Sequence, residues 1–336
     1  MRRVLSVSVH LLAVLLATLT LAGCADSSTS TPASTSGSPA LTSSAAAFPL
    51  SVATMFGNVK VPARPQRVVA LGWADAETLY ALGVQPVGVS DWLAFGGDGV
   101  GPWAQALVKS KPEQLGTTEP NFEKIAALQP DLILNTRSDN NRTTYNTLSK
   151  IAPTVYGPSG VGAYGTNWQQ QVLSVATAVG LKAEGERLIE KTTARFAEVS
   201  AQHPQLKGKT FAVGALYGTN QWGAYVSGDL RADFLTALGM VNAPAIEGQK
   251  SGSFFIPVSP EKLTLLDADL TVMFAIGNND AALRSNVVLK NLPSARSGHL
   301  LVLDQKAVQA YSDGSVLAID YALTHVAPTI IATATS

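Results

Sequence analysis

Cysteine, histidine and net charge are all scarce in this chain of 336 residues. One cysteine cannot form an internal disulfide or a Cys-x-x-Cys site, and four scattered histidines do not suggest a histidine-rich metal site. Lys and Arg together number 24, as do Asp and Glu, whereas a nucleic-acid-binding protein would normally carry a basic surplus. The chain is 46% hydrophobic, and its length suits one large or two medium domains.

Enzyme signatures are also missing. The sequence contains no Gly-x-Ser-x-Gly, no His-Glu-x-x-His and no P-loop. Residues 99–104 formally fit Gly-x-Gly-x-x-Ala, but no strand pattern precedes them, and Pro102 and Trp103 would crowd a pyrophosphate. His203, His299 and His325 are isolated, and we expect them to be surface or packing residues. The sequence therefore predicts neither a catalytic site nor a protein-bound metal.

The first 23 residues have the features of a secretion signal. Arg2 and Arg3 precede an apolar run at residues 4–21, and small residues lead to Cys24. Leu-Ala-Gly-Cys at 21–24 resembles the lipobox of bacterial lipoproteins, which implies cleavage before Cys24 and a lipid on its sulfur. A transmembrane anchor is the alternative, although the run is short for a span. Cleavage removes two arginines and no acid, which leaves 22 basic and 24 acidic residues.

Residues 25–49 consist mainly of Ser, Thr, Ala and Pro, with Asp26 as the one charged residue. This composition predicts a flexible tether. We place the lipidated cysteine and tether at residues 24–55, an N-terminal lobe at 56–181, a connecting helix at 182–203 and a C-terminal lobe at 204–336.

In the folded part, apolar strand patterns alternate with helical patterns, which predicts parallel α/β layers. The strand patterns cover residues 67–72, 84–89, 131–134, 211–216 and 270–276. The helical patterns cover residues 76–82, 122–128, 230–238 and 261–266. Residues 182–203 lack proline and have helical apolar spacing, so about 22 residues at 1.5 Å each would form a rod of about 33 Å. An amphipathic helix packed on one lobe is the alternative.

Two segments recur in the same order in both halves. Glu77-Thr-Leu-Tyr-Ala-Leu-Gly83 matches Asp233-Phe-Leu-Thr-Ala-Leu-Gly239, and the ten residues from Glu123 match the ten from Glu261. One such match could arise from common α/β patterns. Two in the same order favour two similar lobes.

Together these segments resemble ferric-siderophore-binding proteins of ABC importers. The resemblance is carried by residues 64–73, 77–84, 86–89, 120–134, 148–155, 258–263 and 315–323. It covers nearly all of residues 56–330 and belongs to a class that also binds cobalamin and haem. It implies two Rossmann-like α/β lobes joined by one long rigid helix, with the ligand in the cleft between the lobes.

A ferric siderophore is a bulky and often anionic chelate, so its receptor needs aromatic faces and arginines or hydroxyls. Such residues follow predicted strands, where the loops of open α/β sheets form ligand crevices. The predicted ligand-binding residues are Trp73, Trp92, Arg137, Arg142, Tyr217, Trp222, Tyr225 and Asn278. Trp222 and Tyr225 could instead form a hairpin.

Glu77 and Asp233 hold matching places in the first repeated segment. The resemblance implies that acids at these places dock onto arginines of the membrane permease. The alternative is that acids simply favour helix N-termini.

The sequence thus predicts a monomeric, non-enzymatic lipoprotein of the bacterial cell membrane that carries a ferric siderophore to an ABC permease. We expect no cofactor of its own and no nucleic-acid partner. Cobalamin or haem binding by the same fold stays open, with Tyr217 or Tyr225 as a haem ligand, and a surface hydrolase is a more remote alternative.

Overall fold

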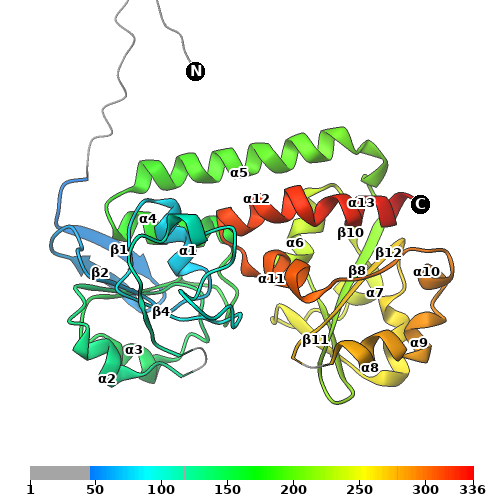
Figure 1. Ribbon diagram of the computed structural model, residues 1–336, viewed down its shortest axis with the longest axis horizontal. Helices are drawn as coiled ribbons and strands as arrows, with labels where there is room; N and C mark the ends of the chain where they lie inside the picture. Colours follow the sequence, from blue (N-terminus) through cyan, green and yellow to red (C-terminus); the bar gives the residue numbers. More distant parts are fainter. Residues whose placement is uncertain (1–45, 117–118, 278) are drawn as a thin grey trace, which may run out of the picture. The chain divides into compact units, whose positions relative to one another are not determined.

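The computed structural model describes residues 46–116, 119–277 and 279–336. These described residues form one compact unit, in which two α/β lobes are joined by a long helix (Figure 1). The strands are β1 Leu50–Thr54, β2 Gly57–Val61, β3 Val68–Ala70, β4 Gly88–Val89, β5 Glu113–Gln114, β6 Leu132–Asn135, β7 Thr154–Tyr156, β8 Thr210–Gly218, β9 Gln221–Tyr225, β10 Val241–Asn242, β11 Phe255–Val258, β12 Leu270–Ala275 and β13 Leu300–Val302.

The α-helices are α1 Asp75–Ala81, α2 Phe122–Ala127, α3 Arg142–Leu148, α4 Trp168–Ala178, α5 Lys182–Gln202, α6 Leu230–Ala237, α7 Pro244–Glu247, α8 Asp280–Ser285, α9 Val287–Lys290, α10 Pro293–Arg296, α11 Gln305–Asp313, α12 Val316–His325 and α13 Ala327–Thr335. Three 3₁₀ turns lie at Gln105–Leu107, Pro204–Leu206 and Pro260–Leu266.

The N-terminal lobe is built on a parallel sheet with the order β5-β4-β3-β6-β7. Both of its faces are covered, so its strands are apolar at successive positions. Val68 and Leu132 belong to the core beneath α1 and α4, whereas Val69 and Ile133 belong to the core beneath α2 and α3. This double burial explains why the short runs at 67–72 and 131–134 stand out in the sequence.

The C-terminal lobe has a mixed sheet with the order β11-β9-β8-β12-β13, and β10 pairs with the start of β8. β8, β12 and β13 are parallel, while β9 and β11 are antiparallel. Alternation again separates two cores, since Val272 and Phe274 face one side and Met273 faces the other. The parallel strands of both lobes end toward the same side of the molecule as the β8–β9 turn (Figure 1).

The long helix α5 packs on both lobes. Its 21 residues correspond to about 32 Å. Leu188 packs against the N-terminal core, and Phe196 and Val199 belong to the C-terminal core. Gly185 lets α5 approach α4 closely, because a Cβ there would stand 2.4 Å from the Cβ of Ala176. The helix therefore joins the two lobes, as the resemblance implies.

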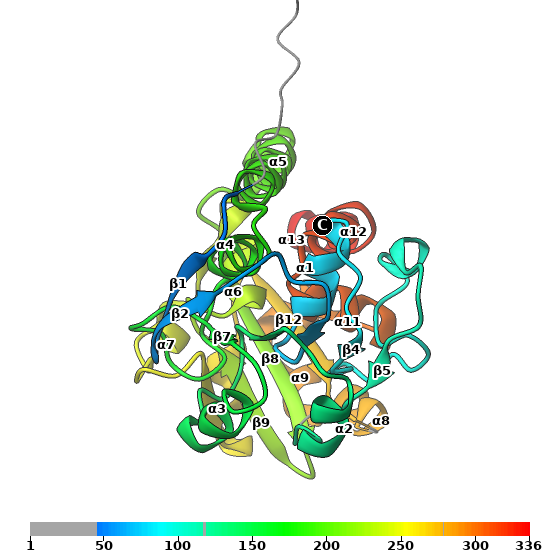
Figure 2. The same cartoon turned by 90° about the vertical axis from the view of Figure 1, so that its left-hand side faces the viewer.

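The last helices do not belong to the C-terminal lobe alone. α12 packs against α5 and α1, and Figure 2 shows it beside α1. Leu317 packs against the N-terminal core, whereas Ile319 and Ala322 belong to the C-terminal core. The division at residue 204 assigned this helix to one lobe, but it bridges both.

Two further expectations need adjustment. Residues 50–54 were placed in the tether, but they form β1, which pairs with β2 and packs into the N-terminal lobe through Val52. The helix expected at residues 261–266 is present, but it is a 3₁₀ helix that spans Pro260–Leu266. Cys24 and Asn278 lie outside the described residues.

Candidate functional site

A cavity of about 600 Å³ opens at the carboxyl ends of β3, β4 and β6, and we call it the strand-end pocket. Crevices at this edge of a parallel sheet are the usual ligand sites of open α/β folds. Its lining residues are Leu71, Trp73, Ser90, Gly116, Glu119, Pro120, Phe122, Asn135, Arg137, Ser138, Asp139, Asn141, Thr144 and Tyr164. Two predicted site residues, Trp73 and Arg137, are among them.

An aromatic stack forms one wall of the strand-end pocket. The Trp73 ring lies between Trp92 and Tyr164, with centroids 4.1 and 4.2 Å away and interplanar angles of 7° and 27°. Tyr164 also contacts Phe254 of the other lobe, with centroids 6.4 Å apart. Trp73 and Trp92, which were each predicted to follow a strand, therefore lie side by side. The stack offers a rigid apolar surface to an organic ligand.

Arg137 is only 4% exposed and holds the loop that carries Tyr164. Its Nε donates to the Tyr164 carbonyl at 3.0 Å, and its own carbonyl accepts from the Trp73 amide at 3.0 Å. Burial lowers the pKa of Arg137 to about 10, while the nearby charge of Asp229 acts against burial. Arg137 therefore stays protonated at neutral pH. Its charge faces carboxylates of the C-terminal lobe.

Arg142, the second predicted arginine, lies elsewhere. It is exposed at the start of α3, and its guanidinium stands 4.1 Å from the centroid of the Phe56 ring. It does not line the strand-end pocket, so the structure does not bring it together with Arg137 and Trp73.

The aromatic residues predicted in the second lobe are also separated from the stack. Trp222 and Tyr225 lie on β9 and are each 3% exposed, in cores on opposite faces of the sheet. β9 pairs with β8 in a hairpin, so Trp222 and Tyr225 lie on the same strand of that hairpin rather than opposite each other. Their burial corrects the expectation of direct ligand contact. Tyr217, at the end of β8, is 37% exposed and contacts Phe255, with centroids 5.2 Å apart.

Glu77 is an interior residue rather than a surface acid. Its carboxylate accepts from the Gly101 amide at 2.8 Å, from Nε1 of Trp103 at 2.5 Å and from Oγ of Ser315 at 2.6 Å. Burial, followed by the charge of Asp313, raises its pKa well above the usual value. We call Glu77, Trp103, Asp313 and Ser315 the buried acid joint. The burial of Glu77 excludes a contact with a permease arginine in this conformation, which corrects the expected docking role.

The same joint explains the Gly-x-Gly-x-x-Ala match at residues 99–104. The Gly101 amide binds Glu77, and a Cβ at Gly101 would stand 2.2 Å from the Trp103 ring. Trp103 packs against the cores of both lobes. This loop therefore packs against both lobes through Trp103.

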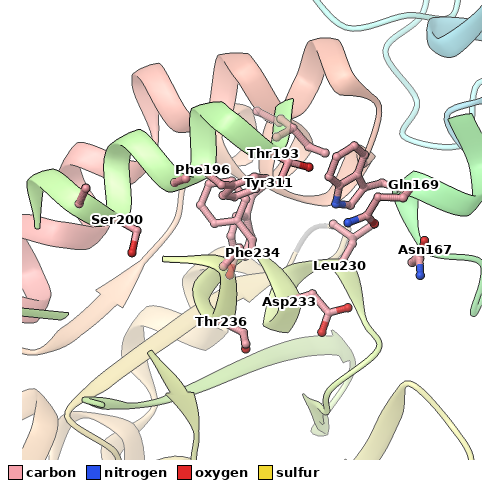
Figure 3. A pocket seen from close by; sticks show the side chains of 17 residues that line it. Asn167, Gln169, Thr193, Phe196, Ser200, Leu230, Asp233, Phe234, Thr236 and Tyr311 are labelled. Carbon is pink, nitrogen blue, oxygen red and sulfur yellow. The ribbon is translucent and has the colours of Figure 1, made fainter. Parts of the chain in front are cut away.

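Asp233 lines a second cavity of about 720 Å³ beneath α5 (Figure 3). Its Oδ1 accepts from the Gly228 amide at 2.9 Å, and burial raises its pKa. Figure 3 shows Asp233 on α6, with Thr193, Phe196 and Ser200 on the facing side of α5. The cavity has mainly apolar walls, and Asp233 is the one charged residue among those that line it.

Tyr164 and Asp139 are pocket residues that the sequence did not single out. Tyr164 lies in a loop without a strand or helix pattern and has a positive φ of 56°. Asp139 follows β6 by four positions and could have been found by extending the search beyond Arg137. The contact of Tyr164 with Trp73 depends on tertiary structure alone.

The described residues contain no group of three or more His, Cys, Asp and Glu side chains placed to hold a metal. Among the same residues, no single helix is long and apolar enough to cross a membrane, and only the bent pair α12 and α13 passes a test of length and composition.

A family model described as periplasmic binding protein matches residues 68–307. A probable siderophore-binding lipoprotein of Bacillus subtilis strain 168 is 29% identical over 282 residues, which cover 78% of this chain and 82% of the relative. A periplasmic solute-binding protein of Mycobacterium smegmatis has a TM-score of 0.74 and 30% identity, covering 85% of this chain and 98% of that one. PiaA of Streptococcus pneumoniae, solved with ferrichrome, has a TM-score of 0.73 and 26% identity, with the same coverage.

Proposed function

Because the chain belongs to the periplasmic binding protein family, we propose that it captures a ferric siderophore outside the cytoplasm and delivers it to an ABC permease. The observation that carries this proposal is the strand-end pocket with its aromatic stack, in a fold shared with a ferrichrome-binding relative. The siderophore-binding name of the Bacillus relative supports the same ligand class.

The pocket suits a chelate whose iron is already coordinated. A volume of about 600 Å³ lies in the range of small-molecule sites. The aromatic stack would contact the organic shell, and the side chains of Ser90, Asn135 and Ser138 would meet its polar atoms. No protein ligand to the iron is required, because the siderophore oxygens fill that role.

A haem carrier would need an axial ligand at the pocket. Tyr225 is buried against Phe274, with Arg231 4.0 Å from the centroid of its ring, and Tyr217 does not line the strand-end pocket. These placements argue against Tyr217 and Tyr225 as haem ligands and leave Tyr164 as the tyrosine of the described lining. Cobalamin binding by the same fold can be distinguished by titration with cobalamin alongside the siderophores.

Docking to the permease requires exposed acids on both lobes. Glu77 is buried, but Glu123 and Glu261, the matching acids of the second repeated segment, are both exposed. They lie beside the start of α2 and in the 3₁₀ turn that precedes β12. The proposal therefore assigns docking to this pair. Replacing both with alanine should leave ligand affinity unchanged and lower iron uptake by cells, and unchanged uptake would contradict the assignment.

The membrane attachment rests on the sequence. Lipidation of Cys24 would leave residues 25–45 between the anchor and the described unit. Cys24→Ser should release the protein from the membrane fraction. Retention of this variant in the membrane would contradict the lipid anchor.

Tryptophan fluorescence tests the ligand directly, because Trp73 lines the pocket and Trp92 stacks on it. Iron-loaded siderophores should quench the emission, and Trp73→Phe should remove most of the change. Quenching by cobalamin alone, or a sharp Soret band that is lost on mutating one tyrosine, would overturn the siderophore assignment.

A further inference from the structure

The charged side chains around the strand-end pocket are unevenly placed. Glu119 and Asp139 are exposed, whereas Arg137, the only cation among the described residues that line the pocket, is buried. The internal positions outside the described ranges, 117, 118 and 278, are Thr, Thr and Asn, so they add no charge. An approaching ligand therefore meets two carboxylates that are more accessible than the one cation.

The guanidinium of Arg137 makes one hydrogen bond within the protein. Its Nε donates to the Tyr164 carbonyl, and its Nη1 lies so close to Gly314 that a Cβ there would stand 3.2 Å away. Asp229, Asp313 and Asp233 of the C-terminal lobe attract its charge, whereas Arg231 repels it. Because these carboxylates outnumber the second arginine, they offset part of the positive charge that an anion in the pocket would meet.

Neighbouring arginines offer no replacement. Arg231 is buried and ion-paired with Asp229 at 2.7 Å. Arg142 lies over Phe56, outside the lining. No lysine occurs among the described lining residues. A bound anion would thus face two exposed acids, whereas the one cation of the described lining is buried.

From this charge distribution we infer that the strand-end pocket selects ferric chelates without net negative charge, an inference that rests on the proposed function. Three hydroxamates carry three negative charges, which cancel the charge of Fe³⁺, and a hydroxamate chelate with a free amine is cationic. Three catecholates carry six negative charges, and citrate complexes of iron are anionic as well. Hydroxamate siderophores are therefore the expected substrate class.

The direct test titrates the full chain, purified in detergent micelles, with four iron-loaded chelates while tryptophan emission is followed. Ferrichrome is the neutral hydroxamate and the iron complex of Desferal the cationic one, while ferric citrate and ferric enterobactin are anionic. We expect the two hydroxamates to bind at least about tenfold more tightly than either anionic chelate, a difference of about 1.4 kcal/mol, because the two carboxylates repel the anionic chelates.

The outcomes separate the two proposals. Binding of none of the four chelates would contradict the proposed function itself. Tight binding of citrate or enterobactin with weak binding of both hydroxamates would keep that function and overturn the inference. Equal binding of all four would also overturn it, because the pocket would then not discriminate charge.

Charge variants test the cause. Glu119→Gln combined with Asp139→Asn should weaken binding of the cationic chelate by about threefold to tenfold and leave ferrichrome unchanged. Glu190→Gln on the exposed face of α5 is the matched control and should change neither. Glu119→Lys combined with Asp139→Lys should raise the affinity for ferric citrate. An unchanged affinity in this double variant would contradict the electrostatic basis.

Arg137→Met tests whether Arg137 itself determines the preference among the chelates. We expect this variant to be less stable but to keep the same order of preference among the chelates. A wild-type preference for anionic chelates that Arg137→Met abolishes would mean that Arg137 turns toward the ligand, and the inference would fail.

Discussion

Glu77 and Asp233 hold the same place in a segment that both lobes carry, but their carboxylates lie in different surroundings. Glu77 is buried in the joint between α1, the 99–103 loop and α12, and accepts three hydrogen bonds. Asp233 is half-buried beside a cavity and accepts a hydrogen bond from the Gly228 amide of its own lobe. Equal position in a repeated segment therefore does not give equal environment.

The difference arises from what covers each first helix. In the N-terminal lobe, Trp103 and the N-terminus of α12 close over α1. In the C-terminal lobe, a cavity of about 720 Å³ remains between α6 and α5. The first helix of the N-terminal lobe is thus covered by α12, a segment from the end of the chain, so the two lobes differ in how their first helices are packed. Together with α5, the buried acid joint ties the lobes at two places, which favours a small change between free and bound states.

Replacing Glu77 or Asp233 with alanine should give the largest difference in stability between the two positions. Glu77→Ala removes the acceptor of three buried donors, and we expect it to lower the free energy of unfolding by about 3–5 kcal/mol. Asp233→Ala loses one partly exposed hydrogen bond and should cost about 0.5–1 kcal/mol. Urea denaturation of the full chain measures both. Similar losses for the two variants would contradict this difference in packing.

The titration of Glu77 should have a smaller effect on stability than its replacement with alanine. The pKa of Glu77 is raised in the folded protein, so its protonated form is favoured there. Its contribution is present below the unfolded pKa, near the ordinary value of 4.5, and is lost as pH rises through the folded pKa. Within that interval, Glu77 makes stability fall by up to about 1.4 kcal/mol per pH unit.

Glu77→Gln isolates this contribution, because the amide cannot titrate. The variant should show a flatter decline in unfolding free energy between pH 4.5 and 8 than the wild type. Asp313→Asn should flatten it as well, since burial also raises the pKa of Asp313. An unchanged slope in both variants would mean that the pair holds no extra proton in the folded state.

The sequence was informative where function depends on local pattern. The apolar runs around β3 and β6, the helix α5 and the aromatic residues at strand ends all followed from residues close together in the chain. The surroundings of Glu77 could not be predicted in this way, because Ser315 lies 238 positions away. Likewise, the acids that face Arg137 come from the other lobe, so its burial depends on how the lobes pack. The position of Trp222 and Tyr225 after a predicted strand also allowed two interpretations, which the pairing of β9 with β8 separates.

The smallest effect on stability should come from lengthening the side chain of Asp233, which lies beside the cavity. Asp233→Glu adds one methylene where the cavity has room, so the change in unfolding free energy should stay within about 0.5 kcal/mol. Glu77→Asp is its reciprocal control, because the shorter side chain cannot reach Gly101, Trp103 and Ser315 together. It should therefore lose clearly more stability. If both swaps were neutral, side-chain length would not distinguish the two lobes, and the closure of α12 over α1 would not depend on the reach of Glu77.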